Sequence, residues 1–180
     1  MTSKIVWGIT GSGDLLPETL EVMSKMTKSK EVEITIVLSE AAVKVLKWYK
    51  IFEKLNNISN KVLVEEDANT PFIVGLLQTG KFDCMLVAPA TGNSVAKIVR
   101  GIADTIITNA VAQANKANVD IYILPVDQKE GTTTTILPNG KKLELTIRNV
   151  DAGNVNKLRG MKGIHVLEKP GEIETIFDNI

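Results

Sequence analysis

Predominantly apolar runs alternate with helix-like segments along most of this chain. These runs lack the polar alternation of a strand with one face in water, and they lie at residues 5–7, 34–38, 85–88 and 121–124. Continuous apolar runs are typical of parallel strands that helices cover on both faces. We therefore predict one α/β domain over residues 1–180, built on a doubly wound, flavodoxin- or Rossmann-like parallel sheet with right-handed crossovers.

Between the runs, apolar residues recur at helical spacing. One stripe follows the glycine-rich turn at 8–13, and a clearer one extends from Ala42 to Phe52 after the second strand. Apolar residues three and four positions apart form one face of a helix. We expect helices at both places and a weaker strand at 62–64, whereas the pattern of 72–77 is ambiguous.

After Pro125 the pattern changes to strict alternation, because leucine or isoleucine occupies every second position from 143 to 147. The preceding Asn139-Gly140 pair is a strong two-residue hairpin signal, since both residues accept positive φ. We predict an antiparallel hairpin over 132–147, as an excursion from the parallel sheet. The remaining elements are expected to be a helix, a short strand and a final helix, at 150–158, at 164–166 and from 171 onward.

Composition argues against several classes of partner and chemistry. Lys plus Arg equals Asp plus Glu at 21 each, so the chain has no net field that would attract nucleic acid or anionic lipid. Cys84 is the only cysteine, which excludes an internal disulfide and a four-thiolate cluster from one chain, and its apolar strand predicts an inert core thiol. No apolar run approaches the length of a membrane span. We expect a cytoplasmic protein with neither nucleic acid nor membrane as partner.

In a doubly wound sheet, ligands bind at the carboxyl ends of the strands, so the loops there carry the candidate chemistry. The first loop is GITGSG, at 8–13. It is not a dinucleotide fingerprint, because Leu16 takes the place of the third glycine, and it lacks the Gly-Lys pair of a phosphate loop. Its N–H groups and the hydroxyls of Thr10 and Ser12 suffice for one phosphate. A tight turn without ligand explains these residues equally well, and Asp14 would repel a phosphate unless its side chain turns away.

Ser39 stands where the second strand meets its helix. Considered by itself, this serine fits a simple N-cap better than a phosphate ligand. Its expected place beside the first loop, at the same edge of the sheet, favours the phosphate.

The loop at 88–105 is the most informative stretch. Pro89 should exclude further strand pairing, and Asn93-Ser94 should cap the helix that follows. Together with Thr91, these residues offer short donors and acceptors that suit the edge of a planar heterocycle, next to the positive end of a helix. A connecting surface loop without a ligand remains an alternative explanation of the same composition.

At this place the chain resembles a known family. Residues 89–94, PATGNS, stand where the flavin-binding homo-oligomeric cysteine decarboxylases have PASANT, and GIAD at 101–104 matches their G-x-A-D. Four further segments are similar to an archaeal branch, the archaeoflavoproteins, which are related to dihydromethanopterin reductase. These segments are WGITGSGD, KWYK, LQTGKFD and DQKEG, at 7–14, 47–50, 77–83 and 127–131. The resemblance extends from residue 4 to about residue 176.

This resemblance implies bound FMN. The residues that would hold the phosphate are Thr10, Gly11, Ser12 and Ser39. Those that would line the flavin ring and complete the pocket wall are Pro89, Ala90, Thr91, Asn93, Ser94, Ala103 and Asp104. We hypothesise that the helix start at Asn93-Ser94, helped by Lys97, stabilises negative charge on the reduced ring. The plain alternative for Lys97 is a solvated surface position.

The resemblance also implies partners. Because this chain has no cluster cysteines of its own, it must obtain electrons from another molecule. The resemblance to the archaeoflavoproteins implies that ferredoxin is this donor. The family is built on trimers with flavin sites near subunit boundaries, so we expect a trimer-based homo-oligomer. The 132–147 hairpin could be a lid on the site or an arm that reaches a neighbouring subunit, and we favour the arm. Trp48 and Tyr49 fit core or interface positions better than flavin stacking.

Two departures from the family narrow the expected chemistry. The decarboxylases have a histidine before the PASANT strand, but 70–76 contains none, and the single His165 lies in a predicted strand where a structural role is expected. Their P-x-M-N-x-x-M-W is replaced by PVDQKE at 125–130. We expect no cysteine decarboxylation and predict an FMN oxidoreductase that carries electrons from ferredoxin or a similar donor. The alternatives are a dihydromethanopterin reductase, whose cleft Asp127, Gln128 and the hairpin could line, and a non-catalytic binding module.

Overall fold

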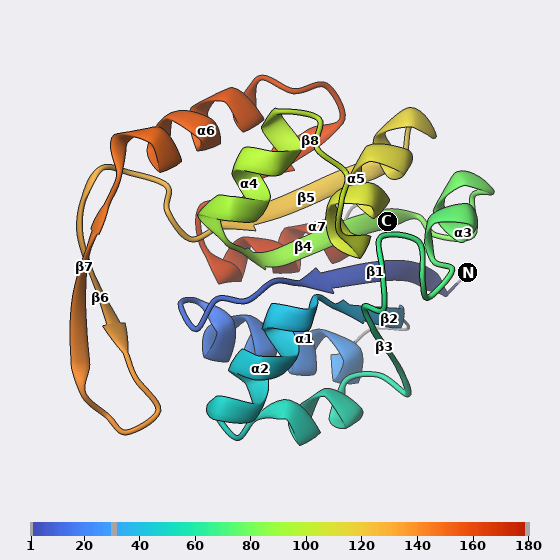
Figure 1. The fold of residues 1–180 in the computed structure, drawn as a ribbon. Helices are drawn as coiled ribbons and strands as arrows, with labels where there is room; N and C mark the ends of the chain where they lie inside the picture. Colours follow the sequence, from blue (N-terminus) through green and yellow to red (C-terminus); the bar gives the residue numbers. More distant parts are fainter. Residues whose placement is uncertain (1, 30–31, 179–180) are drawn as a thin grey trace.

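The computed structural model describes residues 2–29 and 32–178. Within that part of the chain, a parallel sheet has the strand order β3-β2-β1-β4-β5-β8 (Figure 1). Its strands are β1 (Ser3–Ile9), β2 (Val32–Leu38), β3 (Lys61–Val64), β4 (Cys84–Ala90), β5 (Asp120–Pro125) and β8 (Ile164–Val166). The order reverses between β1 and β4, so the carboxyl ends of these two strands are the place where a doubly wound sheet offers a binding crevice.

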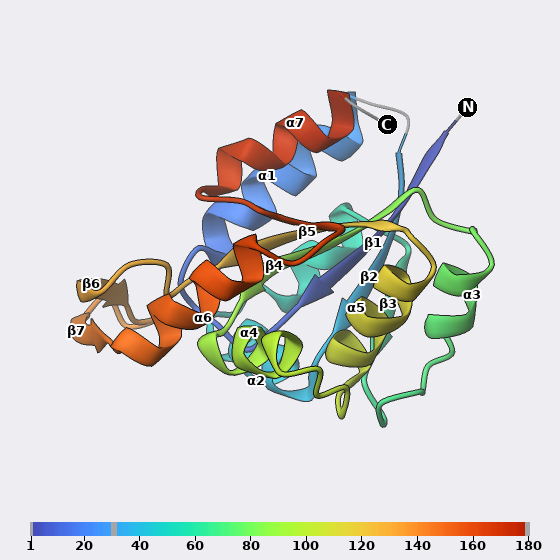
Figure 2. The same cartoon turned by 90° about the horizontal axis from the view of Figure 1, so that it is seen from above.

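Helices cover both faces of the sheet (Figure 2). One layer holds α1 (Leu16–Ser29), α2 (Glu40–Trp48) and α7 (Ile173–Asp178). The other holds α3 (Val74–Gln78), α4 (Gly92–Val99), α5 (Ile106–Lys116) and α6 (Asn149–Arg159). Alternation along β1 supplies both cores, since Ile5 and Trp7 pack in the first and Val6 packs in the second. The apolar runs of the sequence are therefore strands buried on two faces, as predicted.

The predicted antiparallel hairpin is present and stands apart from the sheet, beyond the carboxyl ends of its strands (Figure 1). Its strands are β6 (Gly131–Ile136) and β7 (Lys142–Ile147), paired from Gly131↔Ile147 to Ile136↔Lys142. The expected two-residue turn is wrong. The Gly140 N–H donates to Leu137 O at 2.8 Å, and of the Asn139-Gly140 pair only Gly140 has a positive φ, of 79°. A tight turn followed by one left-handed glycine gives a longer loop.

The helix predicted over 42–52 ends early. The α2 helix stops at Trp48, Lys50 takes a positive φ of 56°, and a short 3₁₀ helix, η1 (Phe52–Asn57), follows. The N–H of Ile51 donates to Leu46 O and that of Lys50 to Lys47 O, both at 3.0 Å, which is the pattern of a Schellman stop. Glycine usually occupies the left-handed position of this stop, and because lysine does so here, the sequence carries no signal of the break.

The remaining segments with a prediction also form regular structure. The ambiguous stretch at 72–77 forms most of α3. The strand predicted at 62–64 is β3, at the edge of the sheet, and the final helix begins at Ile173 after a 3₁₀ turn, η2 (Pro170–Glu172). In the described ranges, every helix is too short or too polar to cross a membrane.

Candidate functional site

Three loops meet at the carboxyl end of the sheet and are tied to one another by hydrogen bonds. The N–H of Thr10 donates to Pro89 O at 3.3 Å, which joins the loop after β1 to the end of β4. The N–H of Ser39 donates to Ile9 O at 3.1 Å, which joins the end of β2 to β1. The predicted phosphate-binding and ring-binding segments therefore lie side by side at the point where the strand order reverses.

The glycine turn needs its glycines for packing. A Cβ on Gly11 would lie 2.6 Å from the Cβ of Ala41, and one on Gly13 would lie 2.4 Å from the hydroxyl of Tyr49. In the described residues, the N–H groups of Gly11 and Gly13 have no protein acceptor, whereas that of Ser12 donates to Thr10 O at 2.8 Å. Two unpaired donors in one tight turn, on either side of Ser12, are suited to an anion.

The Asp14 side chain is hydrogen-bonded to the hairpin, which reduces the repulsion that its place in the sequence suggests for an anion in this turn. Its carboxylate accepts a hydrogen bond from the Thr135 hydroxyl of the hairpin at 2.9 Å. The Tyr49 hydroxyl donates to Ile136 O at 2.9 Å, so the hairpin is held both at the turn after β1 and at the end of α2. The pKa of Tyr49 is raised, first because burial desolvates its side chain and second because the Asp14 charge lies nearby.

Thr10 has a different role from the one the sequence suggests. Thr10 is 2 % exposed, and its hydroxyl donates to Pro89 O at 2.9 Å and accepts from the Thr91 N–H at 2.9 Å. A hydroxyl has one proton to donate, and this one is already used. Thr10 therefore positions the two loops and is not available as a phosphate donor in this arrangement.

The start of α2 combines an expected and an unexpected residue. Ser39 is the N-cap, and its hydroxyl oxygen accepts from the Ala42 N–H at 3.1 Å, which leaves the hydroxyl proton for another acceptor. Glu65, at the end of β3, accepts from the Glu40 N–H at 3.0 Å and from the Ile106 N–H at 2.8 Å. One carboxylate thus caps the starts of α2 and α5, and sequence reasoning missed it because the partners are 25 and 41 residues away.

The loop after β4 begins later than predicted. Pairing continues to Ala90, opposite Pro125, after a register shift between Val87 and Ala90, so the prediction that Pro89 ends the strand is wrong. An irregularity in the ladder accommodates the missing N–H of proline. The cap of α4 also differs from prediction, since the Thr91 side chain, two residues earlier, accepts from the Ser94 N–H. The hydroxyls of Thr91 and Ser94 lie 3.0 Å apart and Asn93 is exposed.

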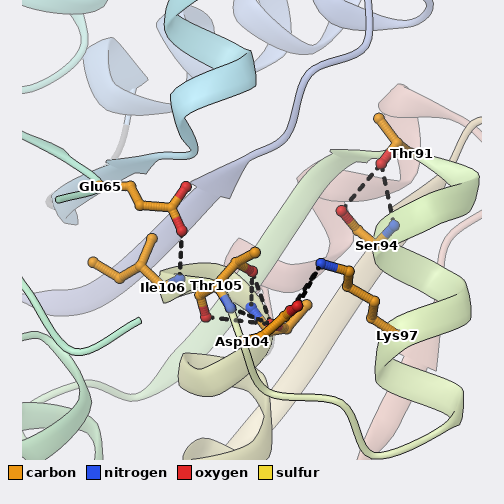
Figure 3. A network of polar contacts seen from close by, with 8 residues as sticks. Glu65, Thr91, Ser94, Lys97, Asp104, Thr105 and Ile106 are labelled. Atoms are coloured by element: carbon orange, nitrogen blue, oxygen red, sulfur yellow. Dashed lines mark hydrogen bonds and ion pairs between the residues drawn. The ribbon is translucent and has the colours of Figure 1, made fainter. Parts of the chain in front are cut away.

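Lys97 faces Asp104 (Figure 3). Its ammonium lies 2.8 Å from the Asp104 carboxylate, and this hydrogen bond lowers the pKa of that carboxyl. The lysine side chain is 23 % exposed, so it is more covered than a solvated surface position would be. Ala103 and Asp104 both lie on the exposed connection to α5. The ion pair places Lys97 beside Asp104, which the sequence did not predict. The place of Asp104 in a pocket wall and the effect of Lys97 on a reduced ring remain predictions.

Two carboxylates crowd the first residue of α4. A Cβ on Gly92 would lie 2.8 Å from an Asp127 oxygen and 3.1 Å from an Asp151 oxygen. Asp151 is 7 % exposed and forms a bidentate ion pair with Arg148. The Arg148 Nε and Nη2 atoms lie 2.6 and 2.8 Å from the two carboxylate oxygens. Burial, followed by the charges of Asp151 and Asp14, raises the pKa of Asp127. Asp151 was not identified from the sequence, because only the packing of α6 against α4 brings it here.

Other residues singled out in the sequence lie elsewhere or serve the fold. His165 contacts Asp120 at 2.9 Å and stacks on Tyr122, near the amino end of β5. Burial raises the pKa of Cys84 to about 12, which fits the inert thiol that was predicted. The Gln128 amide donates to Pro125 O at 3.0 Å and to Leu167 and Glu168. Its role is to close the loop after β5.

Trp48 at the end of α2 and Tyr49 at its C-cap differ in their surroundings. Trp48 is 57 % exposed, so it is not a core residue of the protomer, and an interface position remains a prediction. Tyr49 lies against Gly13 and the hairpin, where a cleft of about 520 Å³ opens between the glycine turn, Pro17 and residues 134–140. The edge as a whole offers unpaired N–H groups and a serine hydroxyl for a phosphate. Next to them are the end of β4, where Pro89 and Ala90 are buried, and the small polar residues at the start of α4, which suit a flat ring. These residues fit the parts of a flavin mononucleotide.

Comparison with known proteins gives an independent view of the same site. The sequence profile of the Flavoprotein family matches residues 1–180. An uncharacterized protein of Methanocaldococcus jannaschii is 55% identical over 174 residues, which cover 97% of this chain and 94% of that one. A dihydromethanopterin reductase (acceptor) of the same organism is 34% identical over 235 aligned positions, covering 97% of this chain and 96% of the reductase.

Among solved structures, DmrB of Burkholderia xenovorans in complex with FMN, described as a cubic protein cage for redox transfer, is similar to this fold. It has a TM-score of 0.83 and 29% sequence identity, and the alignment covers 99% of this chain and 94% of DmrB. An FMN-dependent cysteine decarboxylase from thioviridamide biosynthesis has a TM-score of 0.65 at 17% identity, covering 99% of this chain and 96% of that one. At that identity the second likeness concerns the fold alone.

Proposed function

Because this chain belongs to the Flavoprotein family, we propose that it is an FMN-dependent oxidoreductase. The observation that carries the proposal is the meeting of a glycine turn with unpaired N–H groups, the Ser39 hydroxyl and the 89–94 loop at one sheet edge. FMN supplies reversible electron uptake when bound, and the protein supplies binding and electrostatics.

We assign the parts of the mononucleotide to separate residues. Gly11 and Gly13 would donate their N–H groups to the phosphate, with Ser12 shaping the turn and Ser39 donating its hydroxyl proton. The ring would lie against the segment from Pro89 to Ser94, whose small side chains allow close approach. Thr10 holds the two halves of the site together, and Lys97 with Asp104 would close one side.

The electron donor we propose is a ferredoxin-type iron–sulfur protein. The chain has a single cysteine and therefore cannot hold a four-thiolate cluster, so its electrons must come from another molecule. One organism also encodes both the 55% relative and the 34% dihydromethanopterin reductase. Two family members in one cell favour different roles for them, and this chain is more similar to the first.

A second candidate is reduction of dihydromethanopterin itself. Two relatives carry that activity in their names, the second being a protein of Methanosarcina mazei that is 28% identical over 235 aligned positions. Both alignments are longer than the 180 residues of this chain, so the reductases contain segments that it lacks. That difference is the reason for placing the pterin second.

The test begins with the absorption spectrum of the purified protein, reconstituted with FMN. A flavin spectrum with one FMN per chain supports the proposal, and a colourless protein that refuses FMN contradicts it in favour of a binding module. Reduction of the bound flavin by reduced ferredoxin and by nicotinamide donors then identifies the donor. Reoxidation by dihydromethanopterin, compared with reoxidation by a protein acceptor, separates the two candidates.

The Lys97 hypothesis has its own test. Replacing Lys97 by alanine should lower the midpoint potential of the bound flavin, because a nearby cation favours the reduced, negatively charged ring. Asp104→Asn leaves Lys97 without its partner and should move the potential in the opposite direction. An unchanged potential in Lys97→Ala removes this residue from the role.

We further propose a trimer-based homo-oligomer in which the hairpin reaches a neighbouring subunit. The hairpin carries exposed apolar side chains, Ile136 at 60 %, Leu143 at 40 % and Leu145 at 46 %, that its own chain does not cover. Mass measurement in solution tests this, since a monomer with full flavin content would contradict both the assembly and the arm.

A further inference from the structure

Glu65 joins two helices that lie on opposite faces of the sheet. Its own N–H donates to Leu38 O at 2.9 Å, so its backbone is fixed beside the last residue of β2. One carboxylate oxygen accepts the Glu40 N–H of α2 at 3.0 Å, and the other accepts the Ile106 N–H of α5 at 2.8 Å. Figure 3 shows the second of these bonds. Since α2 packs on one face of the sheet and α5 on the other, the side chain links the two layers across the carboxyl edge.

Helix capping alone does not account for this arrangement. Each of the two helices has its own N-cap, since the Ser39 hydroxyl accepts from the Ala42 N–H and the Thr105 hydroxyl accepts from the Thr108 N–H. These caps serve the third N–H of their helices, and Glu65 serves the first N–H of both. A carboxylate can do so because each of its two oxygens is an acceptor. The two bonds therefore fix the start of α2 relative to the start of α5.

On the α2 side, this bridge sets the position of the proposed phosphate site. Ala41, the second residue of α2, touches the glycine turn, since a Cβ on Gly11 would lie 2.6 Å from the Cβ of Ala41. The N–H groups before and after Ala41 are held by Glu65 and Ser39. In the described residues, the Ala41 N–H has no acceptor. It is therefore available to an anion, together with the unpaired donors of the glycine turn.

On the α5 side, the bridge reaches the wall proposed for the flavin ring. Ile106 follows Asp104 by two residues, on the connection from α4. Asp104 lies 2.8 Å from the Lys97 ammonium of α4 (Figure 3), and α4 begins within the segment proposed to contact the ring. Glu65 thus connects the part of the edge that would hold the phosphate with the part that would hold the ring.

Resting on the proposed function, we infer that Glu65 is a positioning residue that gives the site its preference for FMN over riboflavin, the same flavin without the phosphate. By holding α2 at a fixed distance from α5, Glu65 keeps the phosphate donors in place relative to the ring wall. A preorganised site binds both parts of the ligand without further ordering of the protein. The charge of Glu65 alone would have the opposite effect, because a carboxylate repels a phosphate.

The test compares the affinities for FMN and for riboflavin, by fluorescence titration, in the unchanged chain and in Glu65→Gln. The amide has nearly the shape of the carboxylate but one acceptor oxygen, so one helix start is released. FMN affinity should fall about tenfold. Riboflavin affinity should stay within about twofold, since riboflavin makes no phosphate contact and the ring wall keeps its Lys97–Asp104 ion pair. A general loss of stability would lower both affinities equally, and an effect of charge alone would raise the affinity for FMN.

Two further variants separate geometry from charge. Glu65→Asp keeps the charge but is one methylene shorter, so it cannot span both N–H groups and should lose the preference for FMN as well. Asp67→Asn removes a charge from the same loop, where the carboxylate accepts the N–H groups of Asn69 and Thr70, and should keep the preference of the unchanged chain. Urea denaturation without flavin shows which variants fold, and Glu65→Asp alone decides the matter if Glu65→Gln does not.

The outcomes distinguish this inference from the proposed function. A preference for FMN that is unchanged or increased in Glu65→Gln overturns the inference alone. A preference that Glu65→Asp retains overturns it too, because the effect then belongs to the charge. Failure of the unchanged chain to bind FMN overturns the proposed function with it, and equal affinity of that chain for FMN and riboflavin overturns the phosphate site on which the inference rests.

Discussion

At the amino end of the central sheet, polar groups are paired on the surface. The Lys4 N–H donates to the Asp83 carboxylate at 2.7 Å, and His165 contacts Asp120 at 2.9 Å, all as exposed contacts. At the carboxyl end, Thr10 is 2 % exposed, Asp151 is 7 % exposed, and the unpaired glycine N–H groups lie in a turn too tight for side chains. The first end only closes the fold, whereas the second retains buried polar groups and unpaired donors that packing alone does not require.

This contrast shows which polar groups lower the stability of the fold at the candidate binding site. Buried polar groups are unfavourable unless they are hydrogen-bonded, and a raised carboxyl pKa means that ionisation opposes folding. At the start of α4 both features occur together, since Asp151 is 7 % exposed and the pKa of Asp127 is raised. Changes at the carboxyl end should therefore affect flavin binding most, and matched changes at the amino end should affect it least.

The largest expected effect concerns the amino end. Since burial raises the pKa of Cys84 to about 12, its thiolate fraction at neutral pH should be roughly a thousandfold below that of an ordinary cysteine. Alkylation by iodoacetamide, followed by mass spectrometry, should be slower in the folded protein by about that factor. Labelling at the rate of the urea-unfolded chain would contradict the inert core assigned to this end.

Next is the glycine turn. Gly11→Ala forces a carbon within 2.6 Å of Ala41, so the turn must shift, and FMN affinity should fall by about a hundredfold, with a loss of stability of about 1–3 kcal/mol. Gly153→Ala is the matched control, because the added carbon meets open space within α6. It should raise stability by about 0.5–1 kcal/mol and leave FMN affinity unchanged. Fluorescence titration with FMN distinguishes them, and equal affinities would contradict the assigned turn.

Ser39→Ala should have a smaller effect on binding. It removes one hydroxyl donor to the phosphate, for which a loss of about tenfold in FMN affinity is expected. It also removes the cap of α2, which should lower the free energy of unfolding by about 0.5–2 kcal/mol. Denaturation without FMN measures the cap, and titration measures the phosphate contact. A variant that loses stability but keeps full affinity would restrict Ser39 to capping.

The smallest expected effect is a pH-dependent difference in melting temperature between Asp127→Asn and the unchanged protein. The folded-state pKa of Asp127 is raised, so the stability contributed by its protonated form is complete below the unfolded pKa and is lost as the pH rises through the folded pKa. Asp127→Asn does not ionise, so its melting temperature relative to the unchanged protein should increase as the pH rises above the ordinary pKa of aspartate. Thermal melts of the flavin-free proteins check this, and a constant or decreasing difference would contradict the environment assigned to Asp127.

Much of the fold could be predicted because its strands are covered on both faces. Such strands read as apolar runs without alternation, and the hairpin read as alternation beyond an Asn-Gly pair. The early end of α2 was missed because Lys50, not glycine, adopts the left-handed conformation. The extension of β4 past Pro89 was missed because a register shift accommodates the proline. Both errors arise where tertiary context overrides a local rule.

The site was predictable in outline for a similar reason. Once the strand order is known, the loops after β1, β2 and β4 must meet, and their small polar residues could be read from the sequence. The roles of single residues depended on contacts between distant segments. Thr10 uses its hydroxyl proton on Pro89, 79 residues away, and Glu65 caps two helices. No spacing in the sequence shows that a carboxylate or a hydroxyl already has its partner.

The most direct test of the central claim, that one mononucleotide binds across the carboxyl ends of β1, β2 and β4, is hydrogen exchange with and without FMN. We expect one FMN per chain and slower amide exchange at 10–15, 39–43 and 89–95, while amides at the amino end, around Lys4 and Asp120, are unaffected. Saturable FMN binding with protection elsewhere, or no change at the glycine turn, would contradict it.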